Sequence, residues 1–250
     1  MSDAPPPDHR RLAALGPYFA LDAATTPGEV PPPGFRPLRE FYDPAPDGAL
    51  ARRVRGVARR LGTAEPRVAA SVLHLGLAAR FCSVGLGAAV LLGEVPDLHP
   101  DRAWIRVPEQ GPVGLWLPYP NPGGPARPDR APLPDRFRRT VVEGQLADLA
   151  AAVRSVVPLA DGLLRGNAAS ALAGALRVLD AQTAHAAPHG TARALVAEVL
   201  GHPPLAGTGT LTATPAGTAF RRTSCCLYYR LGPQAGVCGD CCFTRAPARR

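Results

Sequence analysis

Residues 68–93, VAASVLHLGLAARFCSVGLGAAVLLG, form the most apolar stretch of the chain and decide which fold class we expect. His74 and Arg80 interrupt it, and its uncharged part is shorter than the roughly 20 residues that a helix needs to cross a bilayer. We therefore expect two buried helices here in place of a membrane span. The first opens at Pro66 and reaches about Phe81, and a shorter apolar helix follows it.

The same stretch contains GLGAAV, residues 85–90, which begins like the glycine fingerprint of dinucleotide-binding folds. Val90 stands where that fingerprint needs Gly or Ala, and we expect no strand before it. The glycines are therefore expected to serve helix packing. The sequence offers no flavin or nicotinamide site, so a redox function would need a separate electron donor.

Helical spacing of apolar residues recurs along the rest of the chain. In residues 47–61 it lies opposite a row of Arg, with Asp47 as the expected N-cap and Gly62 just past the end. Further helices are expected within residues 9–21 and over 135–157 (capped by Asp135), 161–181 and 191–200. Residues 102–107 and 113–119 are rich in aromatic and β-branched side chains and predict a β-hairpin. The expected fold class is mainly α with a small β-hairpin (α+β) and a Cys-rich C-terminal segment.

The chain divides into four expected parts. They are a disordered lead (1–8), a mainly helical body (9–220) with a Pro-rich crossing at 118–134, a Cys-rich segment (221–245) and a tail (246–250). The N-terminus lacks the apolar run of a signal peptide. We therefore expect a cytoplasmic protein, a setting where structural disulfides are rare and clustered cysteines more often bind metal.

Charge and composition exclude several function classes. All 28 basic residues are Arg, so lysine chemistry such as a P-loop lysine or a Schiff base is absent. The net charge of +8 favours an anionic partner. The Arg are spread along the chain and are not interleaved with aromatic residues, so we expect no nucleic-acid partner. The charge is compatible with loose association with the inner face of the membrane.

Five of the six cysteines lie within residues 224–242, SCCLYYRLGPQAGVCGDCC. They form the pattern C-C-x11-C-x2-C, with one more cysteine adjoining its end. Thiolates select zinc or an iron–sulfur cluster. Adjacent cysteines fit one tetrahedral zinc poorly, whereas four thiolates suit a [2Fe–2S] cluster. The spacing therefore favours iron–sulfur over zinc, with a disulfide framework behind both.

The stretch RRTSCCLYYRLGPQAGVCGDC closely resembles the C-terminal motif of the FhuF-like ferric siderophore reductases, which hold a [2Fe–2S] cluster in a CC-x10/11-CxxC pattern. Weaker similarity is present in LGPYFAL, VAASVLHLGLAAR and GNAASALAGALR. The resemblance implies that residues 221–245 bind the cluster. It assigns the ligands as Cys225, Cys226, Cys238 and Cys241. The spacing also allows Cys242 in place of Cys241, and that alternative stays open.

Six Arg and one Asp lie in residues 221–250. We expect Arg221, Arg222 and Arg230 to lie close to the cluster, where positive charge favours its reduced form. No group beyond the cluster is expected to be catalytic, because the chain shows no Ser-His-Asp or H-E-x-x-H arrangement. Cys82 is expected to be an inert buried thiol.

The resemblance implies an oxidoreductase that reduces a ferric siderophore by one electron and releases Fe(II) in the cytoplasm. The electron would come from a separate donor, such as a ferredoxin or a flavin reductase. Two alternatives remain open. The first is a [2Fe–2S] electron carrier or redox sensor without a siderophore site, and the second is a zinc-stabilised interaction module.

Overall fold

A computed structural model describes residues 9–119, 131–182, 189–215 and 217–247. The expected lead (1–8) and most of the Pro-rich crossing lie outside the described residues, as does the end of the tail. Helical elements of the described chain are η1 (His9–Leu15), α1 (Leu38–Phe41), α2 (Ala49–Leu61), α3 (Pro66–Leu92), α4 (Leu133–Phe137), the π-helical η2 (Arg138–Leu146), α5 (Ala147–Val156), α6 (Asp161–Gln182), α7 (His189–Gly201), and the 3-10 turns η3 (Tyr228–Leu231) and η4 (Pro233–Ala235). The strands are β1 (Asp22–Ala23), β2 (Arg36–Pro37), β3 (Trp104–Arg106), β4 (Gly114–Leu117), β5 (Gly209–Thr214) and β6 (Gly217–Arg222). The expected fold class is confirmed.

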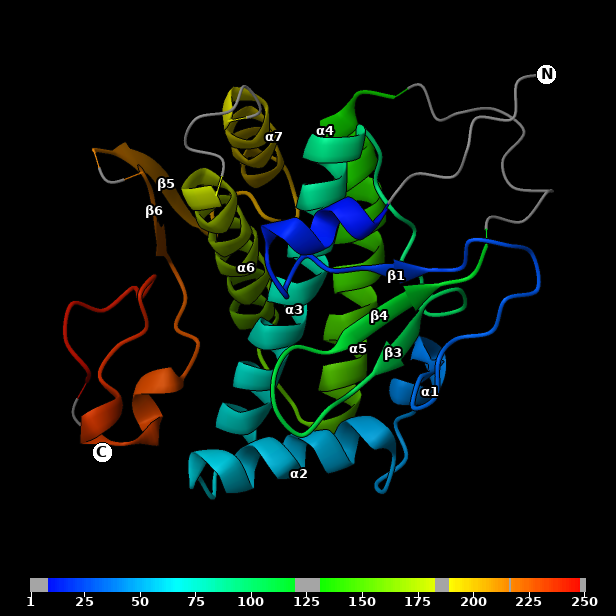
Figure 1. Cartoon of the computed structure of the whole chain (residues 1–250). Helices are drawn as coiled ribbons and strands as arrows, with labels where there is room; N and C mark the ends of the chain where they lie inside the picture. Colours follow the sequence, from blue (N-terminus) through cyan, green and yellow to red (C-terminus); the bar gives the residue numbers. More distant parts are fainter. Residues whose placement is uncertain (1–8, 120–130, 183–188, 216, 248–250) are drawn as a thin grey trace.

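Helix α3 is the centre of the molecule, and the prediction of two helices over this stretch is wrong. It runs unbroken from Pro66, which stands in its first turn, to Gly93, whose φ of 69° ends it. In Figure 1, α5 and α6 run beside α3 and α2 crosses below them. Neighbours on several sides explain why the stretch is apolar all round.

Its length and composition would also let α3 cross a membrane. However, 67% of its most apolar 18-residue window is buried inside the protein. Arg80 is 2% exposed, and its guanidinium donates hydrogen bonds to the carbonyls of Tyr18, Ala20 and Val113. These contacts make α3 the core helix of the protein, and Arg80 joins two loops to its side.

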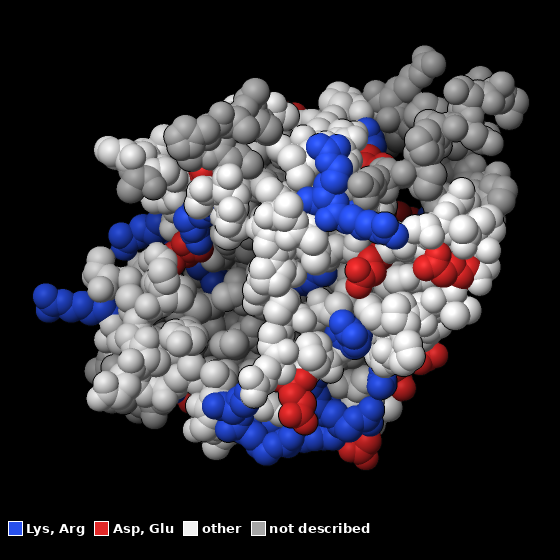
Figure 2. Space-filling model, in the orientation of Figure 1, with Lys and Arg blue, Asp and Glu red and all other residues white. Residues whose placement is uncertain are grey.

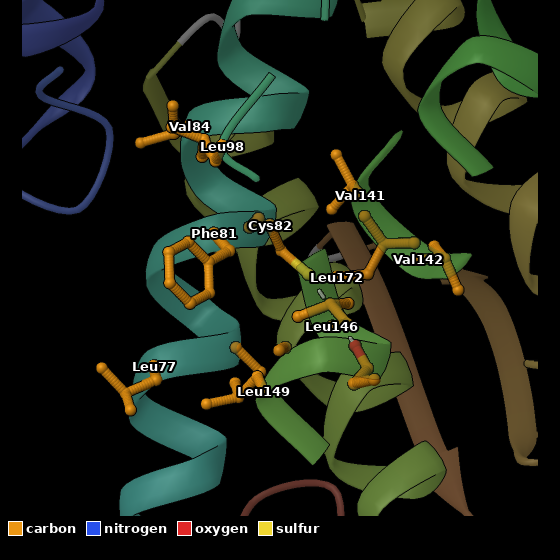
Figure 3. Close-up of a cluster of buried hydrophobic side chains, with 14 of the residues drawn as sticks. Leu77, Phe81, Cys82, Val84, Leu98, Val141, Val142, Leu146, Leu149 and Leu172 are labelled. Carbon is orange, nitrogen blue, oxygen red and sulfur yellow. Dashed lines mark hydrogen bonds between the residues drawn. The ribbon is translucent and has the colours of Figure 1, made fainter. Parts of the chain in front are cut away.

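The glycines of GLGAAV serve helix packing, as the sequence predicts. A Cβ on Gly85 would lie 2.8 Å from Val141 Cγ2, and one on Gly87 would lie 2.7 Å from Phe19 Cδ1. Figure 3 shows Cys82 among buried apolar side chains of α3, η2 and α5. Burial raises the pKa of its thiol to about 12, so Cys82 stays protonated and unreactive.

Two expected helix starts need correction. Helix α2 is capped by Gly48 in place of Asp47, although Gly62 ends it at a φ of 60° as expected. The helical run expected from an Asp135 cap begins earlier, at Leu133, and passes through a π-helical stretch, η2, before α5. The expected helices over 161–181 and 191–200 correspond to α6 and α7, and the one expected within 9–21 is the short 3-10 helix η1.

The row of Arg on α2 lies along one edge of the molecule in Figure 2. Several of these side chains form hydrogen bonds or ion pairs with neighbouring loops. Arg53 donates to the Pro108 carbonyl at 3.0 Å, and Arg55 forms an ion pair with Asp47 at 3.0 Å. The row therefore fastens α2 to the neighbouring loops while remaining largely exposed to solvent.

The predicted hairpin is present as β3 and β4, which pair antiparallel with Trp104 opposite Trp116. Their rings meet edge to face, with centroids 6.2 Å apart. The strands β1 and β2, which the sequence did not predict, extend the hairpin to a sheet of order β1-β4-β3-β2. This sheet covers the side of the helices away from the cysteines (Figure 1).

A second hairpin, β5–β6, was also not predicted from the sequence. Buried and exposed residues alternate along β6, whereas β5 has no buried residue, and Phe220 packs against Ala169 and Ala173 of α6. Strand β6 ends at Arg222, directly before the first cysteine pair. The hairpin therefore lies along α6 and delivers the Cys-rich segment to the end of that helix.

Candidate metal centre

The chain after β6 forms short turns that lie beside the lower ends of α3 and α6 in Figure 1. It brings all five C-terminal cysteines together. The Sγ atoms of Cys226 and Cys238 are 3.4 Å apart, and those of Cys225, Cys241 and Cys242 lie within 4.8 Å of one another. The structure thus gathers the four predicted ligands at one place, with Cys242 beside them.

Backbone N–H groups surround the sulfurs in a regular pattern. Leu227 N–H donates to Cys225 Sγ at 3.2 Å, and Phe243 N–H donates to Cys241 Sγ at 3.4 Å. The amides of Tyr228 and Asp240 act in the same way on Cys226 and Cys238. Each predicted ligand therefore receives an amide from the residue two positions later, whereas the backbone N–H that acts on the Cys242 thiol is its own.

Polar contacts from α3 and α6 hold the first cysteine pair. Ser71 donates its hydroxyl to the Cys226 carbonyl at 2.7 Å, and Asn167 Nδ2 donates to the Ser71 carbonyl at 3.0 Å. Ser224 donates to the Gly162 carbonyl at 2.9 Å. Because Ser71 and Asn167 are fully buried, these bonds fix the pair against the helical body.

The second cysteine pair is held through Asp240, which lies between Cys238 and Cys241. Its carboxylate accepts a hydrogen bond from Ser170 and an ion pair from Arg177, whose Nη1 is 3.0 Å from Oδ1. The Asp240 carbonyl accepts the Arg222 amide at 3.0 Å. Asp240 is 8% exposed and the Arg177 side chain is 38% exposed, so the turn is clamped to α6 by a buried carboxylate whose cationic partner reaches solvent.

Comparison with known families explains this arrangement. Residues 222–243 match the model of the FhuF 2Fe-2S C-terminal domain. This C-terminal segment is FhuF-like. The resemblance predicted from the sequence is thereby confirmed over these residues, and it points to an iron–sulfur cluster at the cysteines. The comparison with curated proteins found no match to the chain.

The crowded thiols of the FhuF-like segment cannot all ionise alone. The pKa of Cys226 is lowered, first by hydrogen bonding with Cys225 and Cys238 and further by the Tyr228 amide and Arg222. The pKa values of Cys225 and Cys238 are raised, chiefly by the same contact with Cys226. One thiolate is favoured at the expense of its neighbours, so bound metal is what would let four ionise together.

The surroundings of Arg222 show whether these residues fit an anionic cluster. Its side chain is 2% exposed, and Nη2 donates to the Leu163 carbonyl at 3.3 Å. Its Nε and Nη1 are buried and have no hydrogen-bond partner among the described residues. A buried guanidinium needs a neighbouring anion. The donor set therefore fits a cluster of net negative charge, and Cys225, Cys226, Cys238 and Cys241 are the thiolates that would hold it.

The other two predicted Arg lie nearer the surface. Arg221 is exposed and donates to the Cys242 carbonyl at 3.2 Å. Arg230 forms an ion pair with Glu65 at the start of α3, at 2.7 Å, and this contact is the main cause of its raised pKa. The structure thus brings Arg222 into the buried site, while the charge of Arg230 is paired with Glu65.

His74, the histidine within the apolar stretch of α3, lies near Arg222. It is 1% exposed, and neither ring nitrogen has a partner among the described residues. Its pKa is lowered to about 4, first by burial and then by the positive charge of Arg222. Neutral His74 therefore lies behind the site without joining the hydrogen bonds that hold it.

Sequence reasoning missed the side chains that hold the cysteines in place, namely Ser71, Asn167, Ser170, Arg177 and Asp240. The first four fall within VAASVLHLGLAAR and GNAASALAGALR, the stretches of weaker family resemblance. Polar residues inside otherwise apolar helices were the signal that could have found them, because buried polar groups need partners.

Proposed function

We propose that the protein is a [2Fe–2S] ferric siderophore reductase that releases Fe(II) in the cytoplasm by one-electron reduction. The observation that carries the proposal is a cluster of cysteines inside a segment that matches the FhuF 2Fe-2S family model. Each predicted ligand accepts a hydrogen bond from the backbone amide two positions later. The proposed ligands are Cys225, Cys226, Cys238 and Cys241.

A [2Fe–2S] cluster, when bound, supplies transfer of a single electron, which is what the change from Fe(III) to Fe(II) requires. The protein residues supply the surroundings. Amide donors to the sulfurs and the buried charge of Arg222 both favour a more negative cluster. Siderophores bind iron through hard anionic oxygens, which hold Fe(II) more weakly than Fe(III), so reduction releases the metal.

The ligand geometry supports iron–sulfur over zinc. Structural zinc sites with four cysteines use two separate C-x2-4-C turns. Here the first pair is directly adjacent, and the Leu227 and Tyr228 amides act on the two sulfurs separately. The proposal further includes a separate electron donor, a ferredoxin or a flavin reductase, because GLGAAV packs inside the core and offers no nucleotide site.

The first test is an optical spectrum of anaerobically purified protein, before and after dithionite, with iron, acid-labile sulfide and zinc measured on the same sample. Equal iron and sulfide, with absorption that dithionite bleaches, is the expected result. A colourless protein with one zinc would overturn the redox assignment and support the zinc module.

The second test mixes dithionite-reduced protein, freed of excess reductant, with ferric siderophores of the hydroxamate and catecholate classes under nitrogen. We expect the absorption of the oxidised cluster to return. One Fe(II), trapped by a ferrous chelator, should appear for each cluster that is reoxidised. If ferricyanide reoxidises the cluster and no ferric siderophore does, the protein is an electron carrier or sensor.

A further inference from the structure

A pocket of about 520 Å³ lies against the turn that carries Cys238. Its walls are residues 15–19, which begin with the last residue of η1, one side of α3, one side of α6, and residues 238–240. The volume is in the range of sites that bind small molecules. We propose that this pocket is the binding site for the ferric siderophore, an inference that rests on the proposed function.

The walls are mostly apolar and remain open to solvent. Tyr18 and Val178 are 42% and 41% exposed, and both line the pocket. A single exposed apolar side chain needs no explanation, whereas two at the mouth of one pocket indicate a surface that a ligand covers. A siderophore complex presents hydrocarbon linkers around its oxygen-coordinated iron, which such walls suit.

The two charged side chains of the pocket lie at its Cys238 end, while Ser83 and Gln182 add uncharged polar groups to the α3 and α6 walls. Ser170, Arg177 and Asp240 lie there, and the charges of Arg177 and Asp240 pair with each other. This end is therefore polar but close to neutral. It offers hydrogen-bonding groups to oxygen ligands of a metal, but it lacks the several free donors that the phosphate of a flavin or dinucleotide cofactor needs.

The pocket lies directly beside the cysteines. Cys238 and Asp240 are part of its wall, so an occupant lies directly beside a predicted cluster ligand. Arg222 and Cys226 are almost fully buried, at 2% exposure each. A ferric complex in this pocket would be held close to the cysteines without displacing the residues that hold them.

Binding is tested with gallium(III) complexes of a trishydroxamate and a triscatecholate siderophore, which match the ferric complexes in charge and shape but are not reduced. Titration calorimetry compares the full-length wild type with Gly174→Leu, which places a side chain in the pocket. A Cβ at Gly174 has ordinary contact with Arg177 at 3.7 Å, so the helix tolerates it. The control is Gly76→Leu on α3, which is exposed and outside the pocket.

We expect wild type to bind at least one complex, Gly174→Leu to weaken that binding at least tenfold, and Gly76→Leu to change it less than twofold. Ala79→Leu on the opposite wall should act like Gly174→Leu. Melting temperature and iron content confirm that each variant is folded and loaded.

Unchanged affinity in both pocket variants would overturn the pocket while leaving the reductase proposal intact, since wild type would still bind and be reoxidised. No binding by wild type, together with no reoxidation by ferric siderophores, would overturn both. Competition by flavin mononucleotide in place of the gallium complexes would instead assign the pocket to a flavin donor.

Discussion

At Leu227 the backbone takes a φ of 67°, the left-handed region that favours glycine. Among the described residues it is the one non-glycine position with a positive φ. The turn lets successive amides reach Cys225 and Cys226, while the Leu227 side chain packs against the main core. A conformation that costs about 1 kcal/mol or more is thus held by the sulfur contacts on one side and by packing on the other.

The amide pattern distinguishes Cys241 from Cys242 as a cluster ligand. Cys241 is 9% exposed and accepts the Phe243 amide at 3.4 Å. We expect Cys241→Ser to lose most of its iron and sulfide, and Cys242→Ser to keep both near wild-type content. Metal analysis and visible absorption of the two variants check this. The reverse result would make Cys242 the partner of Cys238.

Arg222 and Arg221 are adjacent in sequence and differ in burial. We expect Arg222→Gln to lower the reduction potential by roughly 40–85 mV, because a buried charge beside the cluster contributes about 1–2 kcal/mol, and 1.4 kcal/mol equals 59 mV for one electron. Arg221→Gln, at an exposed and screened position, should shift it several-fold less. Equal shifts in a spectroelectrochemical titration would show that burial does not decide the effect.

Helix α6 is the support on which the site is built. Gly166 lies where β6 and the first cysteine pair cross the helix. A Cβ there would clash with Ser224 Oγ and would lie 3.0 Å from Arg222 Nη2. Asp240 attaches the second pair to Ser170 and Arg177, farther along the same helix. One helix thus positions both cysteine pairs.

Gly166→Ala should therefore push the first cysteine pair away from α6. We expect reduced iron content and a melting temperature lower by several degrees, which corresponds to about 1–3 kcal/mol for overpacking. Gly162→Ala is the matched control, since a Cβ there meets nothing within 4 Å. A wild-type iron content in Gly166→Ala would mean that the hairpin moves without disturbing the cysteines.

Asp240→Asn removes the charge from the clamp and leaves Arg177 without its partner. We expect the cluster to be lost several-fold faster in the presence of a chelator, with helical circular dichroism unchanged, because a buried charged hydrogen bond contributes about 1–3 kcal/mol. Asp161→Asn breaks the exposed pair with Arg165 on the same helix and should have no such effect. If both variants lose the cluster at the wild-type rate, the clamp has no role in retention.

The sequence predicted some elements better than others for physical reasons. Helix α2 buries one face and ends at Gly62, so the periodic spacing of its apolar residues predicted it. Helix α3 is buried on most sides, which erased the periodicity that would have shown a single helix. The Thr-rich strand β5 is mostly exposed, so no apolar alternation marked it.

The cysteines themselves were evident from the sequence, whereas their supports were not. Nothing in the spacing of Asp240 shows that Arg177, far away along the chain, reaches it. Likewise, Arg222 and Arg230 look equivalent in the sequence, and only the fold pairs one with Glu65 and buries the other. Long-range pairing decides these roles, and local patterns do not contain it.

The apolar core and the cysteine segment are built from different parts of the chain. Between residues 223 and 247, Cys226, Asp240 and Cys241 are the buried positions among those described, and the main apolar core is built from the body. The segment is joined to that core mainly through hydrogen bonds and charges. The body should therefore keep its fold when the metal is absent.

Removal of the cluster tests this separation. We expect helical circular dichroism of the metal-free protein to stay within about a tenth of the loaded value, while limited proteolysis cuts within residues 223–247. A zinc finger, by contrast, unfolds outright without its metal. Loss of helical signal on metal removal would show that the core depends on the cysteine segment.

The docking of the last segment onto α3 and α6 bears on the order of events during synthesis. A ribosome completes both helices before the cysteines emerge, and the contacts of Ser71, Asn167, Ser170 and Arg177 belong to those helices. The newly made chain can thus fold both helices, with these side chains in place, before the cysteines that follow them are synthesised. Cluster insertion then becomes a late maturation step on an already folded protein, and a shortage of iron would leave a reservoir of folded molecules ready for loading.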